Sequence, residues 1–277
     1  MRTLMLGLDG VEMHAPVVEL ALRWGKRFDA LVVGCVVLDE PGARVSEAML
    51  LSQGYSGPAD EALMNELKAE ARETLDQFRS RCAELEVRSE TLFDSGSPAD
   101  LLLADSHRFD MIMLGRHTHF EFGHKDTDDS TLVRVLKQSP RPVVMVPCIP
   151  ENEPDGPVLI TYDGSPYSAR ALYDFVFSGL GAKRQLHVLS IDRDPEIAAQ
   201  CTDHAVEFLR HHDLNAISHP FDGAFPPLRA IMGAVDQLEA ALLVIGAHPH
   251  SPLREFFWGS TTQAIVNSVD IPVFSSH

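Results

Sequence analysis

The chain repeats one arrangement of a strand, a glycine-containing loop and a pair of small hydroxyl residues. In the second half an apolar run ends in Tyr162-Asp163-Gly164, and Gly246-Ala-His248-Pro249 and Gly259-Ser260-Thr261 follow far downstream. Each half is long enough to bury a core of its own, so the repeat predicts two domains. The first-half landmarks, in the same order, are Leu8-Asp9-Gly10, Gly115-Arg-His117-Thr118-His119 and Ser130-Thr131.

Short aliphatic runs alternate with longer amphipathic stretches in both halves. This alternation implies parallel strands joined by right-handed crossovers, so we expect two tandem α/β domains, each with a doubly wound, mainly parallel five-stranded sheet. Four prolines from Pro147 to Pro157 oppose any regular element and place the boundary between domains of residues 1–150 and 151–277. The predicted strands lie near 3–8, 31–38, 87–92, 110–115, 142–146, 158–163, 184–191, 215–219, 241–246 and 271–275, and the helices near 14–27, 59–84, 98–108, 130–138, 166–180, 195–212, 226–239 and 260–268.

Two features of the first half predict local structure in more detail. Ser97-Pro98 predicts a helix start at which the serine side chain caps exposed amides. Segment 39–58, rich in Gly, Pro and Ser, has no counterpart in the second half. The helix near 59–84 is predicted to bury one stripe of residues spaced by three and four, namely Leu63, Leu67, Ala71, Leu75, Phe78 and Cys82.

Composition excludes several classes of partner. The chain has 40 Asp and Glu against 23 Lys and Arg, a net charge of −17, and an acidic chain repels phosphate backbones, so we expect no nucleic-acid partner. No apolar stretch reaches the roughly 18 to 20 residues of a membrane span, and the N-terminus has no signal-peptide pattern, so we expect a soluble, cytoplasmic protein without a membrane partner. The cysteines form no CxxC pair, which favours reduced, buried or half-buried thiols at Cys35, Cys82, Cys148 and Cys201.

The second-half landmarks outline a nucleotide site built largely from main chain. In a doubly wound sheet, ligands bind beyond the carboxyl ends of the strands, where Asp163 and Gly246 are predicted to lie. Gly259-Ser260-Thr261 begins the last predicted helix, whose free amides and positive dipole end suit a phosphate. The Asp163 carboxylate can accept hydrogen bonds from a ribose hydroxyl or an adenine amine.

These residues resemble the universal stress protein family in its tandem form. The resemblance rests on YDGSPYSARAL after the first strand of the second half and on GAHPHSPLREFFWGSTTQAIV and IPVF at its end, and it covers nearly all of both halves. It implies a Rossmann-like, adenine-nucleotide alpha hydrolase-like fold and a stress-response regulator or sensor that binds ATP or AMP, with or without Mg²⁺. The implied adenine contacts are Thr161, Tyr162, Asp163 and Ile191, and the implied ribose and phosphate contacts are Gly246, His248, Gly259, Ser260 and Thr261.

Both halves depart from the family's Gly-x2-Gly-x9-Gly-Ser/Thr pattern. In the second half Pro249 replaces the second glycine, and the loss of one amide bond to a phosphate costs roughly 1.5 to 3 kcal/mol, or about ten- to a hundredfold in affinity. We therefore expect weak binding there. In the first half Thr118 and Asp129 replace the second and third glycines, and Asp128 and Asp129 place negative charge at the phosphate position, so we expect no triphosphate binding.

Further residues of the second glycine loop have weaker assignments. His248 and His250 alternate as a pair of zinc ligands can, but no third ligand follows at a fixed spacing, so we expect loop structure or phosphate contact and no metal site. Arg254 is the expected cation near the phosphates, with a solvent-exposed pair to Glu255 as the alternative.

Enzyme signatures are poor, and three functions remain open. The chain lacks GxxxxGK[ST], GxSxG and HExxH, so we assign no catalytic residue and expect at most weak ATP hydrolysis. The leading hypothesis is a stress-response nucleotide binder, and the alternatives are a nucleotide-free interaction scaffold of the same fold and a slow ATPase. The resemblance implies an antiparallel contact between the last strands, Val143 to Val146 and Ile271 to Phe274, either within an internal pseudo-dimer or in a homodimer.

Overall fold

The protein forms two compact units. The computed structural model describes residues 1–9, 15–39, 59–116, 118, 120, 131–148, 155–223, 226–247, 265 and 268–277. For residues 59–63 it describes the backbone alone. One unit is Arg2–Gln138, and the other is Ser139–His277 together with Met1. The fifth strand of the first repeat therefore packs with the second unit, while the domain limits 1–150 and 151–277, which follow the sequence repeat, stay a prediction.

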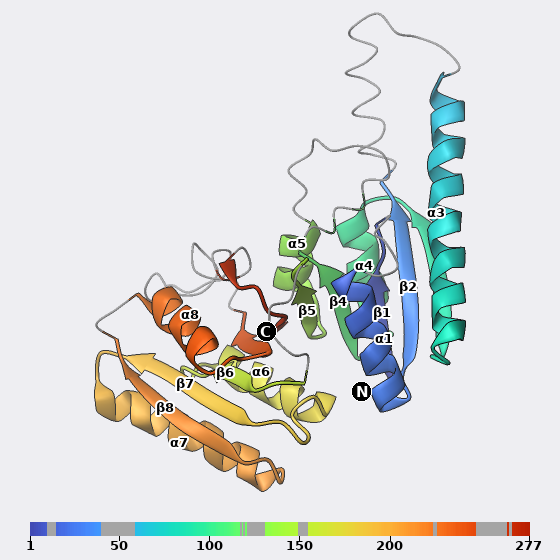
Figure 1. The fold of residues 1–277 in the computed structure, drawn as a ribbon. Helices are drawn as coiled ribbons and strands as arrows, with labels where there is room; N and C mark the ends of the chain where they lie inside the picture. Colours follow the sequence, from blue (N-terminus) through green and yellow to red (C-terminus); the bar gives the residue numbers. More distant parts are fainter. Residues whose placement is uncertain are drawn as a thin grey trace, which may run out of the picture. The chain divides into compact units, whose positions relative to one another are not determined.

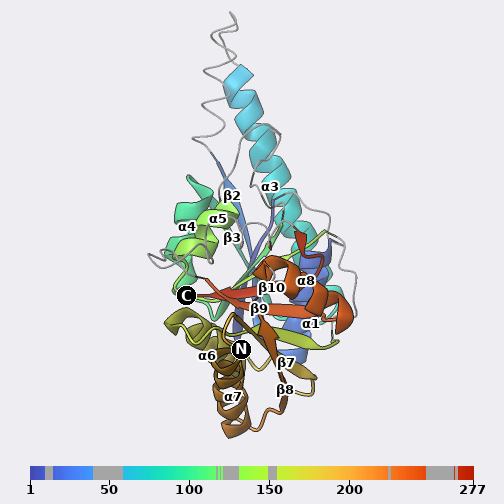
Figure 2. The ribbon, with the colours of Figure 1, turned by 90° about the vertical axis from the view of Figure 1, so that its left-hand side faces the viewer.

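The first unit contains four parallel strands among its described residues, in the order β3-β2-β1-β4. Figure 2 shows α1 and α3 on one face of these strands and α4 and α5 on the other, as a doubly wound sheet requires. The strands are β1 Thr3–Gly7, β2 Leu31–Leu38, β3 Ser89–Ser95 and β4 Met111–Gly115, and the helices are α1 Pro16–Phe28, α3 Ala59–Glu84, α4 Pro98–Ser106 and α5 Thr131–Gln138.

The core of this unit forms where apolar strands meet the apolar stripe of α3. β2 is an almost continuous apolar run because helices cover both of its faces. Gly34 of β2 leaves room for the Phe78 ring, since an added Cβ would lie 2.7 Å from it. The predicted stripe of α3 is confirmed at Leu67, Ala71, Leu75, Phe78 and Cys82, all buried, whereas the side chain of Leu63 lies outside the described residues.

The second unit has its strands in the order β5-β10-β9-β6-β7-β8. All neighbouring pairs are parallel except β5 and β10. Figure 1 shows α7 and α8 on opposite faces of this sheet. The strands are β5 Val143–Val146, β6 Val158–Thr161, β7 Leu186–Asp192, β8 Ala216–Asp222, β9 Leu242–Gly246 and β10 Val273–Ser276, and the helices are α6 Pro166–Ser178, α7 Pro195–His211 and α8 Pro227–Gln237.

The predicted antiparallel contact between the last strands is confirmed within the second unit. Val273, Phe274 and Ser275 of β10 pair with Met145, Val144 and Val143 of β5. On its other side β10 pairs in parallel with β9. Both edges of β10 are therefore used within the chain, and a homodimer through the last strands stays a prediction.

The predicted elements agree with the structure apart from a few details. The Ser97 side chain makes no capping hydrogen bond to the helix amides. Its hydroxyl instead donates to the Asp100 carboxylate, and this hydrogen bond and the Arg134 guanidinium lower the pKa of that carboxyl. All four cysteines are free, but Cys148 is exposed, since it follows the end of β5, so its predicted burial was wrong. The helix near 260–268 lies mostly outside the described residues. Within the described part of the chain no helix has the length and apolarity of a membrane span.

Candidate functional site

The carboxyl edge of the second sheet brings together several residues that the sequence singled out. β6, β7 and β9 are parallel neighbours, so Thr161, Ile191 and Gly246 end adjacent strands at the same edge. Tyr162 and Asp163 follow Thr161 directly, and the Tyr162 amide donates to the Leu189 carbonyl of β7 at 2.9 Å. The other predicted contacts, His248, His250, Arg254, Gly259, Ser260 and Thr261, lie outside the described residues.

Thr161 has a structural hydrogen bond at this edge. Its side chain is buried, and its hydroxyl donates to the Val244 carbonyl of β9 at 3.1 Å. This hydrogen bond links β6 to β9 and uses the hydroxyl proton, so the Thr161 hydroxyl can act only as an acceptor toward another group.

Asp163 occupies a tight turn that presents its carboxylate to solvent. One carboxylate oxygen accepts the Ser165 amide at 3.0 Å, and Gly164 between them adopts a left-handed backbone with φ 75°. Ser165 then caps α6 by accepting the Ser168 amide at 3.2 Å, and Pro166 occupies the first helical position. Within the described residues the second Asp163 oxygen has no partner, so it can accept a hydrogen bond from a ligand.

Gly246 is required by the close approach of α6. An added Cβ would lie 2.6 Å from the Ser168 nitrogen and 2.7 Å from the Tyr167 carbonyl carbon, both main-chain atoms that cannot move aside cheaply. The sequence suggested only that this glycine lets a ligand approach. Packing of the first turn of α6 is a second reason for a glycine here, and it fixes the Asp163 turn over the end of β9.

Cys201 is a neighbour of the site that sequence reasoning missed. Its sulfur would lie 3.2 Å from a Cβ added at Gly164, which places the thiol of α7 directly beneath the Asp163 turn. Burial raises the pKa of the Cys201 thiol, and the Asp163 and Asp192 carboxylates add to the shift. The available signal was its place next to Ala198, Thr202 and Ala205, the buried stripe of α7.

Tyr162 keeps its proton at neutral pH. Burial raises the pKa of the phenol, and Cys201 and Asp163 raise it further. A protonated phenol is a hydrogen-bond donor beside a carboxylate acceptor, which gives this edge both kinds of polar group. Tyr162 and Ile191 are half-buried and Asp163 is exposed, so the edge is accessible.

The same edge of the first sheet is filled by side chains. Phe120 is fully buried, and its ring lies 2.9 Å from a Cβ added at Gly7, the last residue of β1. The buried Thr118 hydroxyl lies 2.9 Å from a Cβ added at Gly115, the last residue of β4. Val37 of β2 is also fully buried. A ligand at this edge would have to displace packed side chains.

Comparisons with known proteins agree with this fold. The Universal stress protein family matches residues 1–147 and 226–275. A universal stress protein of Synechocystis is 28% identical over 173 residues, which cover 60% of this chain and 58% of that protein, so the chain spans a little under three fifths of that relative.

Solved structures are similar over the whole chain. A universal stress protein from Archaeoglobus fulgidus has a TM-score of 0.71 at 18% identity, covering 99% of this chain and 95% of its own. A Pseudomonas aeruginosa protein of unknown function has a TM-score of 0.54 at 15% identity, covering 100% and 92%. At these identities the likeness establishes the fold.

Proposed function

Because the chain belongs to the universal stress protein family, we propose that its second half binds an adenine nucleotide weakly and acts as a stress-response sensor or regulator. The nucleotide is ATP or AMP, and Mg²⁺ accompanies the phosphates when ATP binds. The proposal assigns the site to the carboxyl edge of β6, β7 and β9 and leaves the first half without a nucleotide.

The observation that carries this proposal is the accessible Asp163 turn. An Asp163 carboxylate oxygen that has no partner among the described residues lies at the same sheet edge as half-buried Tyr162 and Ile191, at the strand ends where doubly wound sheets bind ligands. Adenine amines and ribose hydroxyls are donors that such an oxygen accepts. The apolar Ile191 side chain and the Tyr162 ring supply the contact that a purine needs.

Phosphate contacts rest on the sequence alone. Gly259, Ser260 and Thr261 offer amides and hydroxyls at the start of the last predicted helix, and His248, His250 and Arg254 offer donors from the preceding loop. Pro249 removes one amide, so the proposed affinity is about ten- to a hundredfold below that of a site with glycine at this position.

The proposed role is binding rather than catalysis. The chain has no sequence signature of a phosphotransferase or hydrolase, and any ATP hydrolysis is proposed to be slow. Regulation through a homodimer belongs to the same proposal.

Two measurements on the full chain test the proposal. Freshly purified protein is expected to absorb at 260 nm above the level of its aromatic residues or, if the nucleotide dissociates during purification, to take up ATP in a calorimetric titration with Mg²⁺. Gly259→Asp, which places a carboxylate at the phosphate position, is expected to abolish this binding. Absence of bound nucleotide together with no heat at millimolar ATP and AMP would favour the interaction scaffold. Phosphate release that Gly259→Asp removes would favour the slow ATPase.

A further inference from the structure

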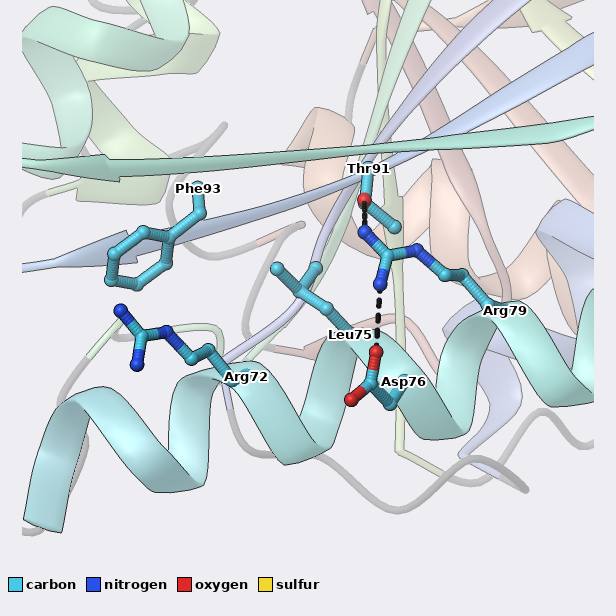
Figure 3. A pocket seen from close by; sticks show the side chains of 6 residues that line it. All are labelled: Arg72, Leu75, Asp76, Arg79, Thr91 and Phe93. Atoms are coloured by element: carbon cyan, nitrogen blue, oxygen red, sulfur yellow. Dashed lines mark hydrogen bonds and ion pairs between the residues drawn. The ribbon is translucent and has the colours of Figure 1, made fainter.

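A groove in the first unit lies between α3 and the edge strand β3. Its volume is about 390 Å³, which falls in the range of small-molecule sites. Figure 3 shows Arg72 and Phe93 at one end, Arg79, Asp76 and Thr91 at the other, and Leu75 between them.

The two arginines of this groove differ in their hydrogen bonding. The Arg79 guanidinium donates to Asp76 at 2.7 Å and to the Thr91 hydroxyl at 2.5 Å, so it is fixed in place. Arg72 makes no hydrogen bond or ion pair with any residue that the structure describes. Thr91 accepts from Arg79, and its hydroxyl proton has no acceptor among the described residues, so it can donate to a ligand.

The groove also has an apolar side. Leu75 is 4% exposed and forms part of the buried stripe of α3, and the half-buried Phe93 ring stands beside it on β3. Figure 3 shows the Arg72 guanidinium extending from α3 toward the Phe93 ring. A flat molecule can therefore contact Phe93 and Leu75 while an oxyanion on it reaches Arg72.

We propose that this groove binds small, flat apolar molecules that carry a carboxylate or phosphate group. Arg72 pairs with the oxyanion, Thr91 donates a further hydrogen bond, and Phe93 and Leu75 contact the ring. Asp76 is held by Arg79 and leaves Arg72 as the cation of the groove that a ligand can neutralise. The site is independent of the nucleotide proposed for the second half.

The negative charge of the chain restricts where an anion can bind. With a net charge of −17, the protein as a whole repels anions, so an anion binds only where a local cation exceeds that repulsion. The Arg72 guanidinium, which has no partner among the residues that the structure describes, meets this condition in a ligand-sized groove. Guanidinium groups match the planar geometry of carboxylate and phosphate.

The test is a titration of the ¹⁵N-labelled full chain, followed by amide chemical shifts. The probes are benzoate, phenyl phosphate and the neutral benzamide. The proposal expects shift changes confined to α3 and β3, with benzamide binding at least tenfold more weakly than the better of the two anions. That better anion identifies the oxyanion that the groove prefers.

Two matched variants decide the role of Arg72. Arg72→Gln is expected to weaken binding of the preferred anion about ten- to a hundredfold, whereas Arg23→Gln, at an exposed position on α1, is expected to leave it unchanged. Both sites are exposed, so both variants should unfold at the temperature of the parent protein. Equal affinities for the two variants, equal affinities for benzamide and the better of the two anions, or shift changes only in the second unit would each overturn the proposal.

Discussion

The carboxyl edges of the two sheets start from the same topology and end in different states. In the second sheet the edge carries exposed Asp163 and half-buried Tyr162 and Ile191. In the first sheet Leu8 and Val37, which match Tyr162 and Ile191 in the repeat, are fully buried, and the Phe120 ring packs against Gly7. Counted from the glycines Gly115 and Gly246, the counterpart of Phe120 is Ser251.

The comparison shows that side chains at the strand ends decide whether the carboxyl edge of such a sheet is buried or accessible. Both sheets keep the order of strands and the Asp-Gly turn in the sequence, so the fold itself does not decide whether an edge can bind a ligand. Among the described residues, the contrast lies in buried Leu8, Val37 and Phe120 of the first sheet against half-buried Tyr162 and Ile191 of the second.

Removal of the Phe120 ring should have the largest effect on the comparison. Phe120→Ala is expected to destabilise the first unit by about 3 to 5 kcal/mol, because the fully buried ring leaves a cavity. Urea unfolding measures this in a Trp258→Phe background, where buried Trp24 reports on the first unit alone. Destabilisation below about 1 kcal/mol would mean that the ring does not close this edge.

Gly246 tests whether α6 holds the second edge in place. Gly246→Ala is expected to cost about 1 to 3 kcal/mol, because the new Cβ would overlap main-chain atoms of α6. The matched control is Gly233→Ala in α8, where nothing lies within 4 Å and the helix should gain roughly 0.5 to 1 kcal/mol. Equal unfolding free energies for the two variants would refute the close packing at Gly246.

Pro249→Gly restores the family pattern in the second half and sharpens the contrast with the first. It is expected to tighten ATP binding about ten- to a hundredfold, or roughly 1.5 to 3 kcal/mol, through one more amide donor. Calorimetry measures the change. The corresponding substitution in the first half, Thr118→Gly, should produce no binding, and heat from that variant would contradict the account of the closed edge.

A histidine pair gives the second sheet a pH dependence that the first lacks. His187 and His219 lie 2.8 Å apart through their ring nitrogens, and the repeat and the strand register place Val33 and Leu92 at the matching positions. Burial, and then His219, lower the pKa of His187 below its ordinary value of 6.5. The unfolded chain then binds more protons as pH falls through that value, so stability is lost on acidification.

This effect is the smallest of the four and needs a paired control. His187→Gln should flatten the fall in unfolding midpoint between pH 7.5 and 5.5, and His211→Gln, at an exposed position on α7, should leave it as in the parent protein. If the two variants have the same pH dependence, the pKa of His187 is not lowered as described.

Most of the fold could be predicted from the sequence because its signals are local. Strand β2 is an unbroken aliphatic run, and α3 shows its buried stripe as spacings of three and four. The antiparallel contact of β5 with β10 was also predictable, though only through the family resemblance. The missing cap at Ser97 was not predictable, because a serine before a proline has the pattern of a cap whether or not its hydroxyl accepts a helix amide.

The candidate site was predictable only in part. The strand ends carrying Thr161, Asp163 and Gly246 follow from the alternation of strands and helices. Non-local packing determined the rest. Three contacts join residues that are far apart in the chain: α6 packs on Gly246, the Cys201 thiol lies next to Gly164, and the Phe120 ring packs on Gly7. No periodicity in the sequence reports such contacts.

The most direct test of the whole account is the number of ATP molecules bound per chain. It is measured in the parent protein and in two variants that exchange the residues at the matched positions 129 and 259. We predict one site per chain, lost in Gly259→Asp and unchanged in Asp129→Gly, because the accessible edge lies in the second half alone. Two sites per chain, or undiminished binding by Gly259→Asp, would contradict it.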